Sequence, residues 1–309
     1  HKALLKCGEY IEQGYVFAVD MDLEKFFDMV SHSKLIEVLS HTITDGRVIS
    51  LIHRYLNAGV IHCGNYEPSQ LGVPQGGPLS PILSNIILNE LDKELERRGH
   101  KFVRYADDLV IFCKSRKAAK RTYEHIVPFI EKKLFLKVNK VKTKVAYIRN
   151  IKFLSYAFGR RSGKCQYRLH PESVQKMKAK IRELTSRSNG WSYEYRKHRL
   201  QWYIRGWSNY FSLAGYKPRL EEWDSWLRHR IRMCIWKSWK RVRTRLHNLE
   251  KFVSDKNRVR MAAFCRKSYW RMSQHPTVHE ALSDERLFRA GYPTFTGCYV
   301  DFNKARGYY

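Results

Sequence analysis

Two short apolar runs, both rich in strand-forming residues, meet at a pair of adjacent acids. Residues 102–112 read FVRYADDLVIF, so apolar or β-branched side chains flank Asp107 and Asp108 on both sides. This pattern predicts a β-hairpin with its turn at or beside the two acids. A further apolar run at residues 15–21 ends beside Asp20 and Asp22. In a strand these two acids would share one face, with Met21 on the other.

Helical periodicity surrounds these strands. Helices are predicted over about 31–56, from Ile82 through Leu95 after a Gly- and Pro-rich loop at 72–81, and over 117–135. Two more short strands are expected around 145–148 and 152–158. The order strand, helix, helix, hairpin, helix, strands predicts an α+β fold whose antiparallel sheet carries helices on one face.

The second half of the chain has a helical pattern. Helices fit about 172–188, 193–213 and 218–246, and a short helix fits 258–267, whereas the Gly-, Tyr- and Phe-rich tail has no pattern we can assign. Aromatic residues recur at helical spacing on the middle helix. This spacing favours a bundle core over a base-stacking surface for Trp202, Tyr203, Trp207, Tyr210 and Phe211.

The chain carries a large excess of positive charge. Its 309 residues include 58 Lys and Arg against 29 Asp and Glu, for a net charge of +29. Residues 171–245 alone hold 19 basic against 6 acidic residues. Such single-signed charge points to a polyanion, and nucleic acid is favoured over a membrane because no apolar run is long enough to span a bilayer. Seven scattered cysteines without a C-x-x-C pair are expected to be reduced thiols rather than a zinc site.

The clustered acids admit two interpretations. Asp107 and Asp108 can serve only the backbone of a turn, and Asp20 or Asp22 can serve as a helix cap. Alternatively, a cation between neighbouring acids relieves their repulsion, and Mg²⁺ prefers carboxylate oxygens. Carboxylates from two adjacent strands can hold two Mg²⁺ ions, one activating the attacking hydroxyl and one stabilising the leaving oxygen in phosphoryl transfer. That is the chemistry of a nucleic acid polymerase.

Five motifs resemble those of reverse transcriptases and follow that family's order. YADD at 105–108 resembles the Y-x-D-D box, DLEKFFD at 22–28 the first catalytic block, and PQGGPLSP at 74–81 the template and nucleotide loop. NKVKT at 139–143 and FLSY at 153–156 are similar to the next two blocks. YIRGWSNYF at 203–211 is similar to domain X, the thumb of group II intron reverse transcriptases, also called maturases. The resemblance runs from about residue 10 to 292 and implies a right-hand polymerase palm followed by an all-α thumb.

The resemblance also assigns roles to individual residues. The family places an aromatic gate five residues after its first metal-binding acid, which selects Asp22 over Asp20 and makes Phe27 the gate that favours a deoxynucleotide. The implied catalytic residues are Asp22, Asp107, Asp108 and Lys142, with two Mg²⁺ ions on the three acids. The implied nucleotide-binding residues are Phe27, Gln75, Gly76 and Tyr105.

The implied domains are a palm with residual fingers elements at 1–168, a domain X thumb of three helices at 169–250, and a basic extension of the thumb or a DNA-binding region at 251–309. Three departures from the family pattern stand out. Ser155 occupies a position where glycine is common. The fingers blocks expected before the first catalytic strand are not found, which leaves the activity of the chain alone open. No Cys-rich His-Asn-His endonuclease follows the thumb, which favours a bacterial type that lacks this domain.

The basic side chains of the thumb are expected to lie outside its core and to contact RNA phosphates. They are Arg196, Lys197, Arg199, Arg205, Arg228, Arg230, Arg232, Lys237, Lys240, Arg241, Arg243 and Arg245. The implied partners are the parent group II intron RNA, an RNA template, a DNA primer or target, and a dNTP, in a bacterial cytoplasmic ribonucleoprotein. Homodimerisation stays open.

The expected function is RNA-directed DNA synthesis together with intron splicing and retrotransposition. Two alternatives remain. One is a non-enzymatic RNA-binding splicing factor on a polymerase scaffold, and the other is a retron-like bacterial reverse transcriptase.

Overall fold

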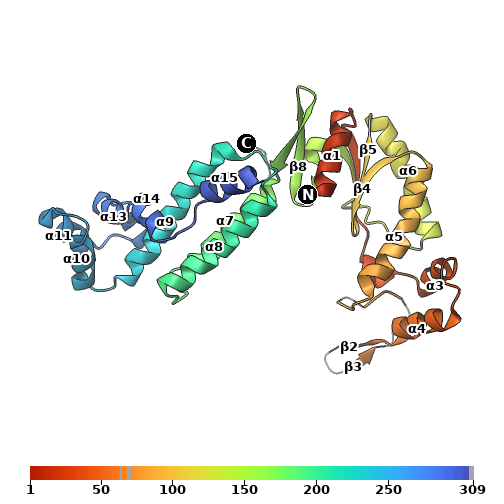
Figure 1. The fold of residues 1–309 in the computed structure, drawn as a ribbon, viewed down its shortest axis with the longest axis horizontal. Coiled ribbons are helices and arrows are strands. Elements are labelled where there is room, and N and C mark those ends of the chain that lie inside the picture. The colour runs from red at the N-terminus through yellow and green to blue at the C-terminus, as the bar shows by residue number, and fades with distance from the viewer. Residues whose placement is uncertain (63–64, 68–70, 75, 306–309) are drawn as a thin grey trace. The chain divides into compact units, whose positions relative to one another are not determined.

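A computed structural model describes residues 1–62, 65–67, 71–74 and 76–305 of the chain. The chain divides into two compact units, His1–Tyr167 and Arg168–Tyr309 (Figure 1). The first unit combines helices with antiparallel strands, and the second is built almost entirely of helices. This arrangement confirms the predicted α+β class.

The secondary structure of the first unit alternates between the two element types. Its helices are α1 (Lys2–Glu12), α2 (Phe26–Met29), α3 (His32–Ser40), α4 (Gly46–Asn57), α5 (Ser80–Arg97) and α6 (Arg116–Lys133). Its strands are β1 (Phe17–Met21), β2 (Val60–His62), β3 (Asn65–Glu67), β4 (Lys101–Tyr105), β5 (Asp108–Cys113), β6 (Lys144–Tyr147), β7 (Lys152–Phe153) and β8 (Tyr156–Arg161), and β9 (Lys164–Leu169) follows.

The main sheet carries the predicted hairpin. Among the described residues it has four strands in the order β4-β5-β1-β6, and every pairing is antiparallel. Tyr105 pairs with Asp108, so Ala106 and Asp107 form a two-residue turn. The hairpin prediction is therefore confirmed, with one of the two acids in the turn and the other at the start of β5.

Strand alternation separates the two faces of this sheet. Val19 and Met21 of β1 and Ile111 of β5 are buried in a core that α5 and α6 complete. On the opposite face α1 covers one part, where the rings of Tyr10 and Phe112 lie 5.8 Å apart. Apolar residues therefore fill one face throughout, and only part of the other.

The prediction of a single helix over 31–56 is wrong. The structure has two helices there, α3 and α4. Asp45 begins the second one, because its side chain accepts a hydrogen bond from the Arg47 N–H at 2.8 Å and so caps the new helix. The sequence contained this signal as an Asp directly before the glycine at position 46.

The second unit packs helices around an aromatic core. They are α7 (Pro171–Leu184), α8 (Tyr193–Tyr210), α9 (Leu220–Ser238), α10 (Val242–Glu250), α11 (Lys256–Phe264), α12 (Tyr269–Met272), α13 (Pro276–Ala281), α14 (Asp284–Arg289) and α15 (Phe295–Ala305). The helix predicted over 218–246 is interrupted after Ser238. Trp239 leaves the helical conformation with ψ at 64° and is buried beside Trp236.

The prediction that the aromatic residues of the middle helix form a core holds only in part. Trp207 and Phe211 are buried, and the Trp207 ring lies 5.6 Å from that of Trp223. Trp202 is 74% exposed and Tyr210 is 44% exposed, so the prediction is wrong for both. The physical reason is that α15 and α7 pack against α8 and leave the arc with Trp202 and Tyr210 uncovered.

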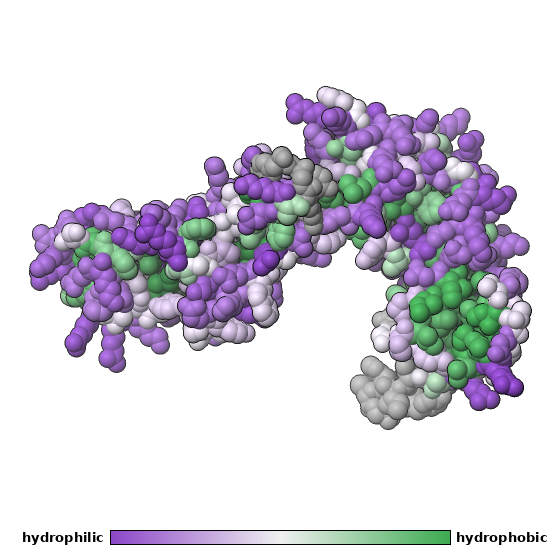
Figure 2. Space-filling model, in the orientation of Figure 1, coloured by the Kyte–Doolittle hydropathy of each residue, from purple (hydrophilic) through white to green (hydrophobic). Residues whose placement is uncertain are grey.

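The surface of the first unit includes an apolar area. Figure 2 shows it over α3 and α4, where Val48 is 41% and Leu51 68% exposed. The nearby Ile82 on α5 is 59% exposed. No helix in the described part of the chain has the length and apolar character that a bilayer crossing requires.

Candidate active site

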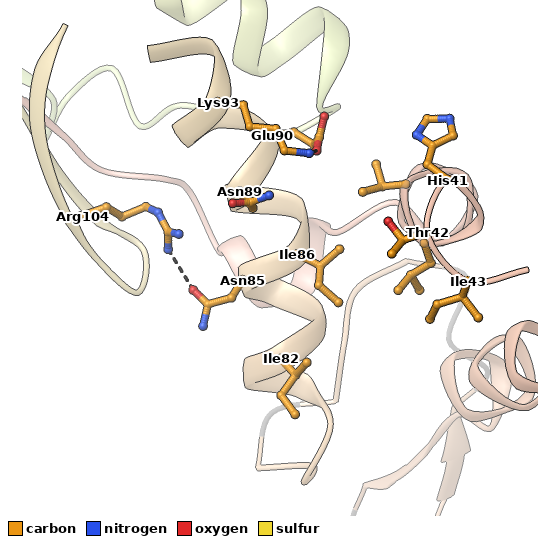
Figure 3. A pocket seen from close by; sticks show the side chains of 12 residues that line it. His41, Thr42, Ile43, Ile82, Asn85, Ile86, Asn89, Glu90, Lys93 and Arg104 are labelled. Atoms are coloured by element: carbon orange, nitrogen blue, oxygen red, sulfur yellow. Dashed lines mark hydrogen bonds and ion pairs between the residues drawn. The ribbon is translucent and has the colours of Figure 1, made fainter. Parts of the chain in front are cut away.

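One arginine holds the turn between β4 and β5 that carries the adjacent acids. Ala106 in this turn has φ at 54°, a left-handed conformation that costs an L-residue about 1 kcal/mol. Arg104 Nη1 donates to Asn85 Oδ1 on α5 at 2.8 Å (Figure 3). It also donates to the Ala106 carbonyl at 3.0 Å. The same guanidinium pairs with Asp92 on α5 at 2.5 Å. Arg104 therefore ties a strained turn to a core helix.

Three acids belong to the sheet face opposite the α5–α6 core. β1 pairs with β5 so that Asp20 lies opposite Val110. Two residues further along each strand, the same register brings Asp22 opposite Asp108. Alternate residues of a strand share a face, so Asp20, Asp22 and Asp108 project to the same side. Acids that are distant in sequence thus meet at the end of this face.

The carboxylates interact electrostatically. Burial, together with the charges of Asp107 and Asp22, raises the pKa of Asp108. Burial, followed by the charge of Asp108, raises the pKa of Asp20 to about 6. Burial and the neighbouring carboxylates both oppose ionisation of these groups. A cation bound among these groups would relieve the repulsion.

The loop after α6 contacts the first acid directly. The Asp22 N–H donates to Thr143 Oγ1 at 3.3 Å, and the Asn139 N–H donates to the Asp22 carbonyl at 2.9 Å. From the same loop, Lys142 Nζ lies 3.7 Å from Asp22 Oδ2. The structure therefore brings the 139–143 motif together with Asp22, and it places a cation beside that carboxylate.

The loop that leads to α5 packs against the residue proposed as the aromatic gate. The Val73 N–H donates to the Phe27 carbonyl at 2.7 Å. Gly72 has φ at 87°, and a Cβ there would lie 2.8 Å from the Phe27 carbonyl oxygen, so the position requires glycine. Gly76 is exposed, and the predicted nucleotide-binding residue Gln75 lies outside the described residues. The start of the 72–81 loop is thus fixed beside Phe27.

The two aromatic candidates differ in their surroundings. Phe27 is half-buried and packs edge-on against Phe26, with ring centroids 5.3 Å apart. Tyr105 is 60% exposed at the end of β4. Packing thus holds the Phe27 ring in place, whereas the Tyr105 ring is open to a ligand.

Sequence reasoning missed the residues that support the site. Arg104 and Asp92 hold the turn, and His32 holds the nucleotide loop, with its Nε2 2.6 Å from the Gly72 carbonyl oxygen. His32 is buried at the start of α3. The available signals were an arginine directly before the YADD motif and a histidine soon after the first block. Neither signal reveals the partner, because the partner lies elsewhere in the sequence.

The carboxylate cluster suits Mg²⁺ by its donor chemistry. Carboxylate oxygens are hard ligands, and Mg²⁺ is usually bound by one or two of them plus water and substrate phosphates. In the described part of the chain, no three His, Cys, Asp or Glu side chains are arranged as a complete ligand set. Asp22 and Asp108, which lie opposite each other, supply oxygens of this kind, and water or substrate oxygens would have to complete the ligand set.

Comparison with protein families accounts for both units. The model of the reverse transcriptase (RNA-dependent DNA polymerase) family matches residues 6–158. The model of the group II intron maturase-specific domain matches residues 174–252. The chain belongs to the group II intron reverse transcriptase and maturase family. Both matched ranges fall within the two structural units described above.

This reverse transcriptase/maturase chain matches only part of the length of each individual relative. Protein YkfC of Escherichia coli is 30% identical over 48% of this chain and 47% of its own length. The group II intron-encoded protein LtrA of Lactococcus lactis is 37% identical over 30% of this chain and 15% of its own length. The chain thus spans less than half of these relatives.

One solved structure was also found to be similar. It is telomerase from Candida albicans with a telomeric RNA fragment, which is 15% identical in sequence over 86% of this chain and 52% of that chain, with a TM-score of 0.44.

The basic residues expected to contact RNA do not all lie on the surface of the second unit. The expectation that they lie outside its core is wrong for two of them. Arg196 is 5% and Arg232 4% exposed. Arg232 pairs with Asp284 and donates to the Leu282 carbonyl at 2.8 Å, contacts that offset the cost of burying its charge. The residues that remain exposed are Arg199, Arg205, Lys240, Arg241 and Arg243. Those that are half-buried are Lys197, Arg228, Arg230, Lys237 and Arg245.

Proposed function

We propose that the protein is an RNA-directed DNA polymerase that also binds its parent group II intron RNA, promotes its splicing and copies it during retrotransposition. The observation that supports the polymerase activity best is the shared face of Asp22 and Asp108 beside the turn that carries Asp107. The family membership supports the RNA partner.

In this proposal Asp22, Asp107 and Asp108 hold two Mg²⁺ ions. When bound, the metal ions would supply Lewis-acid stabilisation of the attacking and leaving oxygens of phosphoryl transfer. The Lys142 ammonium, 3.7 Å from Asp22 Oδ2, lies where it could neutralise charge on the departing pyrophosphate. The protein itself contributes mainly positioning and electrostatic stabilisation.

The incoming dNTP would lie between Phe27 and the nucleotide loop. Phe27 would contact its sugar and exclude a 2′-OH, while Gln75, Gly76 and Tyr105 would contact the nucleotide. The attachment of Gly72 and Val73 to the Phe27 segment supports this role, because it fixes the distance between gate and loop. RNA template and DNA primer complete the substrate set.

The exposed basic residues of the second unit would bind intron RNA through its phosphates. A protein that neutralises several phosphates loses affinity steeply as salt rises. We assign this role to the exposed Arg199, Arg205, Lys240, Arg241 and Arg243. The buried Arg196 and Arg232 are left out because RNA cannot reach them.

An Asp107→Ala variant of the full-length protein tests the polymerase site. We expect it to abolish cDNA synthesis from a primed RNA template while intron RNA binding stays close to the unsubstituted level. Glu9→Gln on α1, where the exposed Glu9 pairs with the exposed Lys6, serves as the matched control and should retain both activities. Primer extension by Asp107→Ala at the normal rate would refute the assignment.

The non-enzymatic splicing factor is the alternative from another class. It predicts intron binding and splicing without any primer extension, so primer extension by the unsubstituted protein separates the two functions. A retron-like role predicts no preference for structured intron RNA over random RNA. The maturase-specific match argues against this second alternative, and competition binding with the two RNAs tests it.

A further inference from the structure

One face of α8 carries exposed aromatic and basic side chains together. Tyr195, Arg199, Trp202 and Gly206 follow one another at spacings of four, three and four residues, which places them on one side of a helix. Trp202 is 74% and Tyr195 48% exposed. An indole this exposed contributes little to the core, although full burial of a large aromatic side chain would be favourable.

The Trp202 indole borders two hollows on the surface of the second unit. One, of about 260 Å³, lies between α7 and α8 and is lined by Lys180 and Arg199 among others. The other, of about 680 Å³, is lined by Arg205 and by residues of α15 that include one acid, Asp301. A flat aromatic ring therefore stands between two cavities, and each cavity has an arginine at its wall.

The two arginines are exposed and available for phosphate. Within the described residues, neither Arg199 nor Arg205 has a hydrogen-bond acceptor or an ion-pair partner. Other arginines of this unit differ, since Arg230 donates to Thr185 Oγ1 at 2.6 Å and Arg245 to the Trp239 carbonyl at 3.0 Å. Charge complementarity therefore favours a polyanion over an apolar protein segment on this face.

A glycine inside α8 has no packing explanation. Gly206 lies one turn after Trp202 and is exposed, and a Cβ built on it would have no described atom within 4 Å. Glycine in a helix interior costs about 0.5–1 kcal/mol relative to alanine. Its φ lies outside the left-handed region, so backbone geometry does not require it either. Close approach of a ligand to the helix backbone would explain it.

We propose that this face of α8 binds a nucleic-acid strand with one unpaired base stacked on Trp202. Arg199 and Arg205 contact its phosphates, and its backbone passes over Gly206. The inference rests on the proposed function, which makes nucleic acid the partner of this unit. Stacking on an aromatic ring tolerates any base, because every base has a π face. Single-stranded RNA and single-stranded DNA share this chemistry.

Equilibrium binding of fluorescent oligonucleotides to the full-length protein tests the proposal. Trp202→Ala should weaken binding to a single strand by roughly 5- to 150-fold, the range for loss of one stacked base. Trp202→Phe should retain most of the affinity, because it keeps a ring. Both variants should preserve the salt dependence, whereas Arg199→Gln should reduce its log–log slope by about 1.

Gly206→Ala gives a second test, because it should change stability and binding affinity in opposite directions. The variant should raise the thermal midpoint, because alanine favours the helix, and it should weaken single-strand binding, because the methyl group obstructs the strand. A glycine with only a structural role would not combine these effects. Gly215→Ala adds the same methyl group at an exposed loop glycine whose Cβ position also has no atom within 4 Å, and as the control it should leave single-strand binding unchanged.

The controls decide which part of the reasoning fails. Met261→Ala removes a side chain that is 75% exposed on α11 and should leave binding unchanged. Single-strand binding by Trp202→Ala at unsubstituted affinity overturns the inference, and so does an equal loss on duplex RNA. Failure of the unsubstituted protein to bind any nucleic acid would instead overturn the proposed function. Parallel RNA and DNA titrations identify which strand occupies the face.

Discussion

The contact between Arg104 and the acid-bearing turn predicts an effect on metal dependence. Arg104→Gln removes the ion pair with Asp92 and the hydrogen bond to the Ala106 carbonyl. Ala106 is in the left-handed region, so the turn depends on outside contacts to keep its conformation. Without this contact, Asp107 would be held less firmly in the position that the proposed metal site requires.

Two magnitudes follow from the structure. The Arg104 and Asp92 side chains are 14% and 20% exposed, so their ion pair is neither fully exposed nor fully buried. A surface ion pair contributes under about 1 kcal/mol, whereas breaking a buried pair costs about 3–5 kcal/mol. We therefore expect Arg104→Gln to lower the free energy of unfolding by about 2 kcal/mol. Loss of a residue that orients metal ligands typically costs 10- to 100-fold in metal affinity or activity.

The assay is primer extension at increasing Mg²⁺ concentration. Arg104→Gln should raise the Mg²⁺ concentration for half-maximal rate by at least about 10-fold, and high Mg²⁺ should restore part of the rate. Asp92→Asn should have the same effect, and the double variant should be no worse than either single one. Arg98→Gln is the matched control, because it breaks the ion pair with Glu94 on the same helix without reaching the turn.

One result would refute this reasoning. If Arg104→Gln lowers stability as expected but extends primers with an unchanged Mg²⁺ dependence, Arg104 supports the fold and does not position the acids. A larger loss in the double variant than in both single ones would show that the two residues act separately.

Three further outcomes are expected. Gly72→Ala should destabilise the first unit by about 2 kcal/mol or more in urea unfolding, because its methyl group would meet the Phe27 carbonyl oxygen at a left-handed backbone position. Ser155→Gly should stabilise the chain by up to about 1 kcal/mol, because Ser155 has φ at 67° in the turn between β7 and β8. Burial lowers the pKa of His229, so the contribution of this residue to stability should be constant above about pH 6.5 and fall as pH decreases below it, because the unfolded state then binds a proton that the folded state does not. His229→Gln should reduce this pH dependence in thermal unfolding.

The acid-bearing sheet was predictable from sequence because local rules determine it. Strand alternation alone puts Asp20 and Asp22 on the face opposite Met21, and a two-residue turn beside Asp107 fits the apolar runs around it. What the sequence could not reveal is the support of these acids. The partner of Arg104 is on α5, and only the folded chain brings Asp92 to it.

The exposure of α8 could have been inferred more closely from sequence. Residues of an α-helix are separated by about 100°, so Trp202 and Trp207 are about 140° apart and cannot both lie at the centre of one buried stripe. The buried arc follows Leu200, Ile204 and Trp207 at spacings of four and three residues. Treating all aromatic residues of the helix as one group hid this difference.

The formation of α15 depends on a contact that local sequence patterns cannot predict. Phe295 begins α15 and is completely buried, with its ring 5.6 Å from that of Trp207. The buried carboxylate of Asp224 accepts hydrogen bonds from the Phe295 N–H at 2.6 Å and the Thr296 N–H at 3.1 Å. An acid on α9 therefore caps a helix that begins about 70 residues later, and no sequence window contains both partners.

The net charge of the chain overstates how many basic side chains are available to contact nucleic acid. Some arginines of the second unit are occupied by the fold itself, as Arg232 is by Asp284 and Arg245 by backbone carbonyls. These side chains add to the long-range potential that attracts a polyanion, but they cannot also bind phosphates without giving up their internal contacts. In the proposed function, direct phosphate contacts come from exposed basic residues such as Arg199 and Arg205. Because those two flank Trp202, charge and stacking surface coincide on the same face of α8.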